Sequence, residues 1–577
     1  MGLIFKYLSK SKWLAFSGLI VKVISTVMDL LIPYILSYII DKVIIKDSIP
    51  LVVTWGCIMI VAALCGFLFN VLANRIASET ARRSSYALRK DLFYKIESLS
   101  ESQKDKITLP SLVGRMTTDT YNIHQMTGTM QRLGVRSIVL LFGGIIVCAL
   151  LDAMLTLVMG IILPLIMLVI IIIARNGMPL FNDLQDANDD LVQNVRENAT
   201  GARIIKALAK ESEEIDRFND ININVSDKNI KANIKMAGLN PFITVLLNVG
   251  LVCVIAIGAI RCNAGLCTNG VMISFTSYFV IISNAMLSTT RVFITYSKAT
   301  ASAKRINEVF ELEDDLTKEN DDSYVNSYIE FDNVTFSYLK QHNNIENISF
   351  KLMKNESLGI IGATGSGKTT ILNLLMRFYD PDSGNIYVDH KNIKSYDVEK
   401  LREMFGVVFQ NDLLFNESIY ENVNFGRNLS EEEVILALKR AQAYDFVSKL
   451  ENNINFKLDA KGNNLSGGQK QRLLIARALA GNPQIILLDD SSSALDYKTD
   501  ALLRKELYKN YSNLIIVAQR ISSVKDCSKI MVIDRGQIVG LGTHKELLSN
   551  CIVYSQIAYS QMGITKEDEE VELNGKC

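Results

Sequence analysis

Eight consecutive residues, 362–369, have the composition of a phosphate-binding loop. They read Gly-Ala-Thr-Gly-Ser-Gly-Lys-Thr and fit the pattern G-x-x-x-x-G-K-[ST] at every fixed position. In such a loop the glycines let backbone N–H groups turn toward phosphate, Lys368 reaches the β- and γ-phosphates, and the Thr369 hydroxyl ligates Mg²⁺. An apolar strand at 356–361 and a helix opening at Thr370 supply the expected setting, because the positive helix N-terminus faces the same phosphates. The residues expected to hold a nucleoside triphosphate are Gly362, Ala363, Thr364, Gly365, Ser366, Gly367, Lys368, Thr369 and Thr370.

Two later stretches suit the same chemistry. An apolar strand at 485–489 ends in Asp489, a carboxylate suited to hold Mg²⁺ opposite the loop. Before this strand along the chain, a serine and two glycines begin a long helix at 466. This is again the geometry of an anion-binding helix N-terminus. The residues of this signature segment are Ser466, Gly467, Gly468 and Gln469. The chain thus carries two helix N-termini suited to phosphate.

Two further side chains have both a binding and a structural interpretation. Tyr338 ends the stretch 334–338 and could stack on an adenine, although taken alone a strand-end aromatic is the simpler interpretation. Gln410 ends the strand 407–410, where a neutral amide could contact Mg²⁺ or a water molecule. A surface glutamine is the ordinary alternative, so the residues by themselves leave both positions open.

The composition excludes some function classes. Lys+Arg and Asp+Glu are equal at 61 each, so no basic field argues for a nucleic-acid partner. Hydrophobic residues make up 49% of the chain, and the C-terminal half is polar, so the apolar residues must be concentrated in the N-terminal half. The nine scattered cysteines and four unclustered histidines show no metal-ligand spacing. Cys262 and Cys267 are too weak a pair to predict a disulfide.

The N-terminal half predicts six membrane helices, since about 20 apolar residues in a helix cross a bilayer core. The apolar stretch 137–174 is too long for one crossing, so we expect two helices that turn at Asp152. Basic residues gather in the two long connections, 74–136 and 175–238, which by the positive-inside rule are cytoplasmic together with the N-terminus and the phosphate-binding half. The predicted spans are 13–40, 51–73, 137–151, 153–174, 239–260 and 271–289.

The long connections keep helical periodicity, so we expect helical hairpins that extend from the membrane and dock on another domain. Polar residues inside the spans are costly in lipid and should face a cavity or a partner helix. For Lys22 and Asp29, which share one helix face, a role in a cavity and plain packing are equally favoured.

The combined motifs resemble the ATP-binding cassette (ABC) family. They are the loop 362–369, the segment 465–469, Asp489 and the segment 493–496 (Ser-Ala-Leu-Asp). The N-terminal half is similar to ABC exporters with long intracellular helices. Residues 196–207 of this chain fit the second intracellular loop of those exporters. The resemblance implies a multidomain fold, an all-α six-helix transmembrane domain with long cytoplasmic extensions followed by an α/β P-loop nucleotide-binding domain. The expected boundaries are 1–312 for the transmembrane domain, 313–327 for a linker, 328–563 for the nucleotide-binding domain and 564–577 for an acidic tail.

The resemblance also implies residue roles. Tyr338 would stack on the adenine of ATP, which reverses the interpretation from the residue alone, and Gln410 would link Mg²⁺ to the membrane helices. Segments 111–118 and 216–224, at the far ends of the two hairpins, would be coupling helices that press on the nucleotide-binding domains. The signature segment would bind the γ-phosphate held by another cassette, so a second half-transporter is required. The expected Mg²⁺ ligands are Thr369, Gln410 and Asp489.

The chain departs from the family pattern at two positions of one ATP site. The general base that follows Asp489 is usually glutamate, and this chain has Asp490, whose shorter side chain places the carboxylate roughly 1 Å from its working position and costs on the order of 100-fold in rate. The switch histidine is replaced by Gln519, whose neutral amide can hydrogen-bond a γ-phosphate but cannot become a cation. The signature segment is intact, which resembles the degenerate half of heterodimeric multidrug exporters.

The leading hypothesis is one subunit of a heterodimeric ABC exporter in the cell membrane, driven by ATP with Mg²⁺. Its cargo would be a hydrophobic or amphipathic drug, lipid or peptide, and membrane lipid and the second subunit would be its partners. A homodimeric exporter with two slow sites is one alternative. An ATP-gated or regulatory membrane subunit that does not pump is the other.

Overall fold

The computed structural model describes residues 2–237, 239–321, 323–338, 340, 342–491 and 494–562, without the side chains of 163, 166–167, 169–178, 181–182, 235–236, 239–240, 243 and 290. The predicted acidic tail and Ser493 lie outside these residues. The chain forms two compact units, of which the first contains Met1–Glu97 and Pro110–Glu311. The second contains Ser98–Leu109 and Leu312–Cys577. The end of the first hairpin therefore belongs to the unit that carries the phosphate-binding loop.

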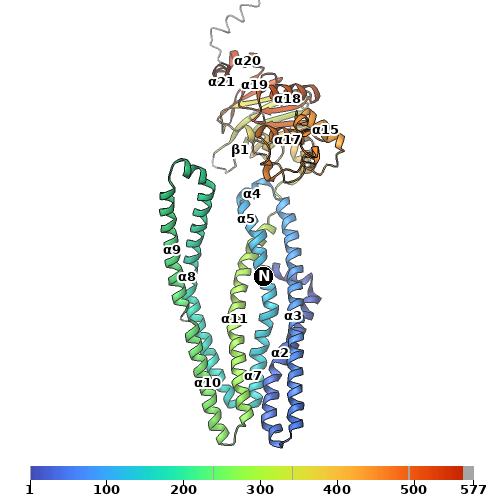
Figure 1. Cartoon of the computed structure of the whole chain (residues 1–577). Coiled ribbons are helices and arrows are strands. Elements are labelled where there is room, and N and C mark those ends of the chain that lie inside the picture. Colours follow the sequence, from blue (N-terminus) through green and yellow to red (C-terminus); the bar gives the residue numbers. More distant parts are fainter. Residues whose placement is uncertain are drawn as a thin grey trace, which may run out of the picture. The chain divides into compact units, whose positions relative to one another are not determined.

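Every secondary-structure element that the structure describes in the first unit is a helix (Figure 1). Its elements are α1 (Gly2–Ser9), α2 (Lys12–Tyr38), η1 (Ile39–Val43), η2 (Ile44–Lys46), α3 (Ile49–Ser98), α5 (Leu109–Gly114), η3 (Arg115–Asp119), α6 (Thr120–Thr129), η4 (Met130–Gly134), α7 (Val135–Leu151), α8 (Ala153–Ala207), α9 (Glu211–Ala237), α10 (Leu239–Asn263) and α11 (Asn269–Phe310). Among the described residues, five helical stretches are long and apolar enough to cross a membrane: Lys12–Lys46, Ile49–Ser98, Leu109–Leu151, Thr244–Asn263 and Asn269–Phe310. The predicted span 153–174 lies on α8, where Ala153–Ile162 is a shorter apolar segment.

Helix α11 supplies much of the core of this unit. Phe275, Tyr278 and Phe279 are buried, and they pack with apolar residues of α2, α7 and α8. The hydroxyl of Tyr278 donates to the Leu30 carbonyl of α2 at 2.6 Å. The buried hydroxyl of Tyr278 thus has a hydrogen-bond partner inside an apolar layer, as buried polar groups generally do.

The predicted positions of the hairpin ends are wrong. The first hairpin ends in a separate short helix, α4 (Glu101–Ile107), whereas 111–118 lies on α5 and η3. A capping box starts α4, because Ser100 and Gln103 each accept from the other's backbone N–H. The second hairpin turns between α8 and α9 at 208–210, so 216–224 lies inside α9. There Ala209 adopts a left-handed backbone with φ of 51°, which ends α8.

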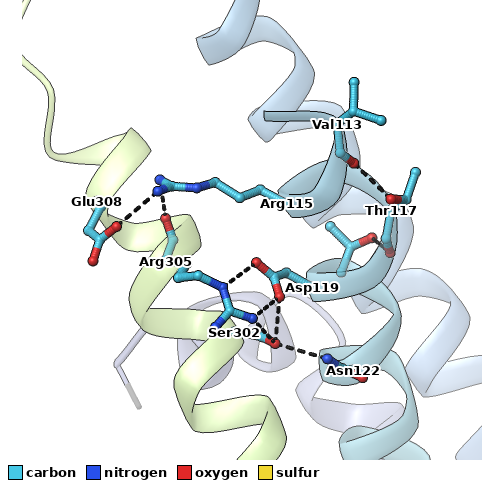
Figure 2. Close-up of polar contacts among 9 residues, drawn as sticks. Val113, Arg115, Thr117, Asp119, Asn122, Ser302, Arg305 and Glu308 are labelled. Carbon is cyan, nitrogen blue, oxygen red and sulfur yellow. Dashed lines mark hydrogen bonds and ion pairs between the residues drawn. The ribbon is translucent and has the colours of Figure 1, made fainter. Parts of the chain in front are cut away.

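A buried polar network joins η3 and α6 to α11 (Figure 2). Asp119 pairs with the guanidinium of Arg305, with one Nε–Oδ2 distance of 2.9 Å, and accepts a bond from Ser302 Oγ at 2.8 Å. Asn122 donates to Ser302 at 3.0 Å, and Arg115 donates to the Arg305 carbonyl at 2.6 Å. The π-helical turn η3 directs both Arg115 and Asp119 toward α11. Two helices are thereby fixed to each other by charge-assisted bonds.

Replacing Asp119 by asparagine should lower the free energy of unfolding of the first unit. The Asp119 side chain is only 4% exposed and that of Arg305 is 49% exposed, so the loss should lie near 2 kcal/mol, below the range for a fully buried pair. Glu79→Gln is the matched control, because Glu79 pairs with Arg82 and Arg83 on the helix surface, where solvent screening leaves such pairs with little effect on stability. Thermal unfolding of the purified variants measures both. Equal effects of the two substitutions would contradict the assignment of a stabilising network.

The second unit contains two sheets. The four-stranded sheet has the order β2-β1-β4-β5 with antiparallel pairs. The six-stranded sheet has the order β10-β9-β3-β8-β7-β6, parallel except for the edge strand β10. The strands are β1 (Ile329–Phe336), β2 (Ile345–Leu352), β3 (Leu358–Gly362), β4 (Ser383–Val388), β5 (Lys391–Asn392), β6 (Phe405–Val408), β7 (Ile485–Asp489), β8 (Leu514–Val517), β9 (Lys529–Asp534) and β10 (Gln537–Gly542).

Short helices connect and cover these strands. They are α12 (Lys368–Leu375), η5 (Ile393–Ser395), α13 (Val398–Glu403), α14 (Ile419–Asn424), α15 (Glu431–Arg440), α16 (Tyr444–Val447), η6 (Asn453–Asn455), η7 (Ala460–Gly462), α17 (Gly467–Leu479), α18 (Tyr497–Asn510), α19 (Ile521–Val524), α20 (His544–Asn550) and α21 (Ile552–Met562). The strands β3 and β7 are buried along their whole length, which explains their continuous apolar sequences. Because β3, β6, β7 and β8 run parallel, the residues that follow them gather at one edge of the sheet.

Candidate functional site

The phosphate-binding loop connects β3 to α12. Gly365 and Gly367 have φ of 80° and 102°, a backbone that favours glycine. A Cβ at Gly367 would also lie 2.8 Å from the Asn344 carbonyl oxygen. The Nζ of Lys368 folds over the loop and donates to the carbonyls of Gly362 at 3.0 Å and Ala363 at 2.7 Å. Lys368, which the sequence predicts to bind phosphate, is thus held against the loop at the N-terminus of α12.

The strand ends bring an acidic pair to the loop. The Thr369 hydroxyl donates to Oδ2 of Asp489 at 2.8 Å, and Asp489 is 2% exposed. Burial raises the pKa of Asp489, and Asp490 raises it further, against the Thr369 hydrogen bond and the charge of Lys368. Burial raises the pKa of Asp490 as well, against the charges of Arg520 and Lys368. The two carboxylates are thus held next to each other, with Lys368 and Arg520 as the cations that oppose their charge.

A cavity of about 200 Å³ lies over the loop. Its lining includes Lys368 and Thr369 from α12, Asp489 at the end of β7 with Asp490 directly after it, Gln410 after β6 and Gln519 after β8. Gln519 donates from Nε2 to Oδ2 of Asp490 at 3.3 Å. The two side chains that are predicted to depart from the family pattern therefore contact each other in the same cavity as the phosphate-binding loop. Asp490 has φ of 48°, a left-handed backbone that aspartate adopts more readily than most residues.

Tyr338 stands beside the loop and is linked to a residue that sequence reasoning missed. Its hydroxyl accepts from Nδ2 of Asn373 at 3.0 Å, and its ring meets that of Tyr379 edge to face at 5.0 Å between centroids. The hydroxyl of Tyr379 in turn donates to Asp105 of α4 at 2.7 Å. Burial and the Asp105 carboxylate both raise the pKa of Tyr379, which stays a neutral donor. No local sequence signal marks this contact, because it joins residues distant along the chain.

The signature segment begins α17 and does not line the cavity over the loop. Ser466 and Gln469 form a capping box, with Ser466 N–H donating to Gln469 Oε1 at 2.9 Å and Gln469 N–H donating to Ser466 Oγ at 3.4 Å. A Cβ at Gly468 would lie 3.2 Å from the Ala494 carbonyl oxygen. The positive N-terminus of α17 thus has glycines at its first two positions, which leave its backbone N–H groups accessible.

The residues at the loop fit a triphosphate with a divalent cation. The left-handed glycines, the Lys368 ammonium and the helix N-terminus provide donors and positive charge for phosphate. A hydroxyl and a carboxylate already in contact, Thr369 and Asp489, are the hard oxygen donors that Mg²⁺ takes. A bound cation would also offset the buried negative charge of Asp489 and Asp490. The site can therefore bind a nucleotide and position water near a carboxylate.

Comparison with known proteins agrees with this geometry. The ABC transporter transmembrane region matches residues 15–286, and the ABC transporter domain matches residues 345–493. An uncharacterized ABC transporter ATP-binding protein of Bacillus subtilis (strain 168), YfiB, is 33% identical over 560 residues, covering 96% of this chain and 98% of the relative. A second from the same organism, YknU, is 31% identical over 575 residues, covering 96% of each chain.

A solved structure shares the fold. A bacterial Atm1-family ABC exporter with ATP bound superposes with a TM-score of 0.81 at 22% identity, covering 96% of this chain and 98% of that chain. At this level of identity the likeness concerns the fold alone. The helical unit followed by an α/β unit is thus an arrangement known from exporters.

Proposed function

This chain belongs to the ABC transporter family, and from that premise we propose that it is one subunit of a heterodimeric exporter whose own ATP site is degenerate. It is a membrane protein with an ATPase domain that is cytoplasmic in this family. The observation that carries the proposal is the contact between Asp490 and Gln519 in the cavity above Lys368. Both departures from the family pattern affect one ATP site, while the signature segment keeps its pattern.

ATP binding at this site is supported by the residues around the loop. Lys368 would exchange its bonds to the loop carbonyls for bonds to phosphate oxygens, and Tyr338 would stack on the adenine. Thr369, Asp489 and Gln410 would hold Mg²⁺, which supplies charge neutralisation to the phosphates. Binding requires none of the chemistry that Asp490 and Gln519 lack.

Hydrolysis at this site is expected to be slow. The Asp490 carboxylate is one methylene short of the family's glutamate, so it holds an attacking water less well, and a misplacement of about 1 Å costs on the order of 100-fold. Gln519 donates to Asp490 at 3.3 Å and offers no ionisable ring to offset charge on the γ-phosphate. ATP would therefore remain bound here as a clasp between the two subunits.

The signature segment would complete the site of a partner. The N-terminus of α17 suits the γ-phosphate of an ATP held on another cassette. The partner would supply the glutamate and histidine absent from this chain, and its hydrolysis would drive export of a hydrophobic or amphipathic compound.

Purifying this chain alone and measuring its ATPase activity tests the proposal. We expect tight binding of ATP with Mg²⁺ and turnover on the order of 100-fold below that of an exporter with glutamate and histidine. Co-purification with a second half-transporter should restore turnover. Brisk ATP hydrolysis by the isolated chain would overturn the heterodimer proposal in favour of a homodimer. A complex that binds ATP and does not pump its cargo against a gradient would favour a gated subunit.

A further inference from the structure

Polar side chains of α2, α3, η4 and α7 form a cluster inside the helical unit. Lys22 donates from Nζ to Oδ1 of Asn70 at 2.7 Å and of Asn74 at 3.3 Å. Arg136 pairs with Asp29 at 3.2 Å. Both Lys22 and Asp29 thus bond to neighbouring helices. The inner-leaflet cluster is defined as Lys22, Asp29, Asn70, Asn74, Arg132 and Arg136.

The cluster lies at membrane depth. The rings of Tyr38 and Trp55 pair at 4.6 Å and mark the outer membrane interface, where such aromatic residues gather. Counting about 20 residues inward along each helix reaches Leu19 on α2 and Asn74 on α3. The same count back from the outer end of α7 at Leu151 reaches Arg132. By this count Arg132 and Arg136 are expected at the cytoplasmic end of the bilayer core.

The cluster carries more positive than negative charge. Arg132 donates to the Ser78 hydroxyl at 3.4 Å and to the Gly128 carbonyl at 3.2 Å, so its described contacts are neutral. Lys22 bonds to two amide oxygens. The cluster thus contains three cationic side chains and one carboxylate, Asp29, which pairs with Arg136. Like charges repel more strongly in a medium of low dielectric than in water.

The cluster is accessible at Arg136 and Asp29, whereas Lys22 is only 4% exposed. The side chain of Arg136 is 44% exposed and that of Asp29 is 33% exposed. Exposed charges at this depth face an aqueous cavity, because lipid solvates them poorly. A shallow hollow on α3 adjoins the cluster at Asn74 and is lined further by Val71, Arg75, Ser78, Glu79 and Arg82. The carboxylate of Glu79 pairs with Arg82 there.

We propose that the inner-leaflet cluster binds the anionic group of the transported compound, so that the cargo is an anionic amphiphile. The inference rests on the proposed export function. Arg132 and Arg136 donate charge-assisted bonds to a phosphate, sulfate or carboxylate group, and the apolar faces of α2 and α3 take the hydrocarbon part. Binding neutralises charges that the empty cluster leaves unbalanced.

Equilibrium binding to the full chain in nanodiscs of zwitterionic lipid, without ATP, tests this proposal. The probes are 1-oleoyl lysophosphatidate and 1-oleoyl lysophosphatidylcholine, which share a tail and differ in head-group charge. Lysophosphatidate should bind at least tenfold tighter. Arg132→Gln should weaken it about tenfold, equivalent to 1.4 kcal/mol, and Asp29→Asn should strengthen it severalfold because it removes the opposing carboxylate. Neither substitution should alter binding of the zwitterionic probe.

The controls separate charge recognition from misfolding. Arg132→Lys keeps the charge and should keep most of the affinity, and Lys46→Gln, at the exposed outer end, should change nothing. Glycerol 3-phosphate should not compete, because it lacks the tail; full competition would overturn an amphiphile site in favour of a free-anion site. Equal affinities for the two probes, or no response to Arg132→Gln and Asp29→Asn, would also overturn the proposal. A vigorous ATPase in the isolated chain would overturn the heterodimer and leave this binding result standing.

Discussion

Replacing Gly468 by aspartate should abolish ATP hydrolysis by the assembled transporter, whereas replacing Lys368 by alanine in the same chain should leave most of it. The Cβ at Gly468 would lie 3.2 Å from the Ala494 carbonyl, and a carboxylate there would place negative charge at the helix N-terminus offered to the partner's γ-phosphate. Loss of one preorganised anion-binding element costs about 100-fold or more. Steady-state ATPase activity of the reconstituted complex measures both substitutions.

The prediction rests on the difference in ATPase activity between Gly468→Asp and Lys368→Ala. Lys368→Ala would remove a contact to this chain's own nucleotide, which is proposed to turn over slowly, so its effect on the total rate should be small. Gly468→Ala is a control for the added Cβ without the charge and should cost less than Gly468→Asp. Unchanged thermal unfolding of each variant excludes a folding defect. The reverse order, with Lys368→Ala inactive and Gly468→Asp active, would mean that this chain holds the working site.

Restoring the two missing groups should produce the opposite effect. Asp490→Glu together with Gln519→His should raise hydrolysis at this chain's own site by about 100-fold. The longer carboxylate would reach the attacking water, and an imidazole would replace the amide that now bonds to Asp490 at 3.3 Å. Trapping of ADP on this chain by vanadate measures the gain.

One single substitution and one double substitution serve as controls for the restored pair. Asp490→Glu alone should give part of the increase, since the left-handed φ of 48° is less favourable for glutamate than for aspartate. Asp490→Asn with Gln519→Ala should remain as slow as the natural chain. If the double restoration traps no more ADP than this control, the defect lies elsewhere in the site.

The site residues can be predicted from the sequence where they belong to short local motifs. The residues of the phosphate-binding loop are contiguous, and Asp489, Gln410 and Gln519 follow strands, so parallel pairing is enough to bring them together. The predicted fold class, helical membrane domain then α/β domain, is confirmed by the family matches and the exporter structure. The residue roles at the ATP site stay predictions.

Features that depend on tertiary contact were not predictable. The predicted hairpin ends, 111–118 and 216–224, lie too far along the chain, because the helical periodicity of the sequence continues on both sides of the turns. The capping box of Ser100 and Gln103 was the local signal for α4. The bond from Tyr379 to Asp105 joins the ring beside Tyr338 to α4. The cluster around Lys22 likewise assembles from four elements, so neither its partners nor its charge balance could be derived from one helix.

The most direct measurement is to find which subunit holds the ADP that vanadate traps in the wild-type complex after one turnover. A photoreactive ATP analogue identifies that subunit, because it crosslinks to the chain whose aromatic side chain stacks on its base. The account predicts that ADP is recovered on the partner and intact ATP on this chain, beside Tyr338. Recovery of trapped ADP mainly on this chain would contradict it.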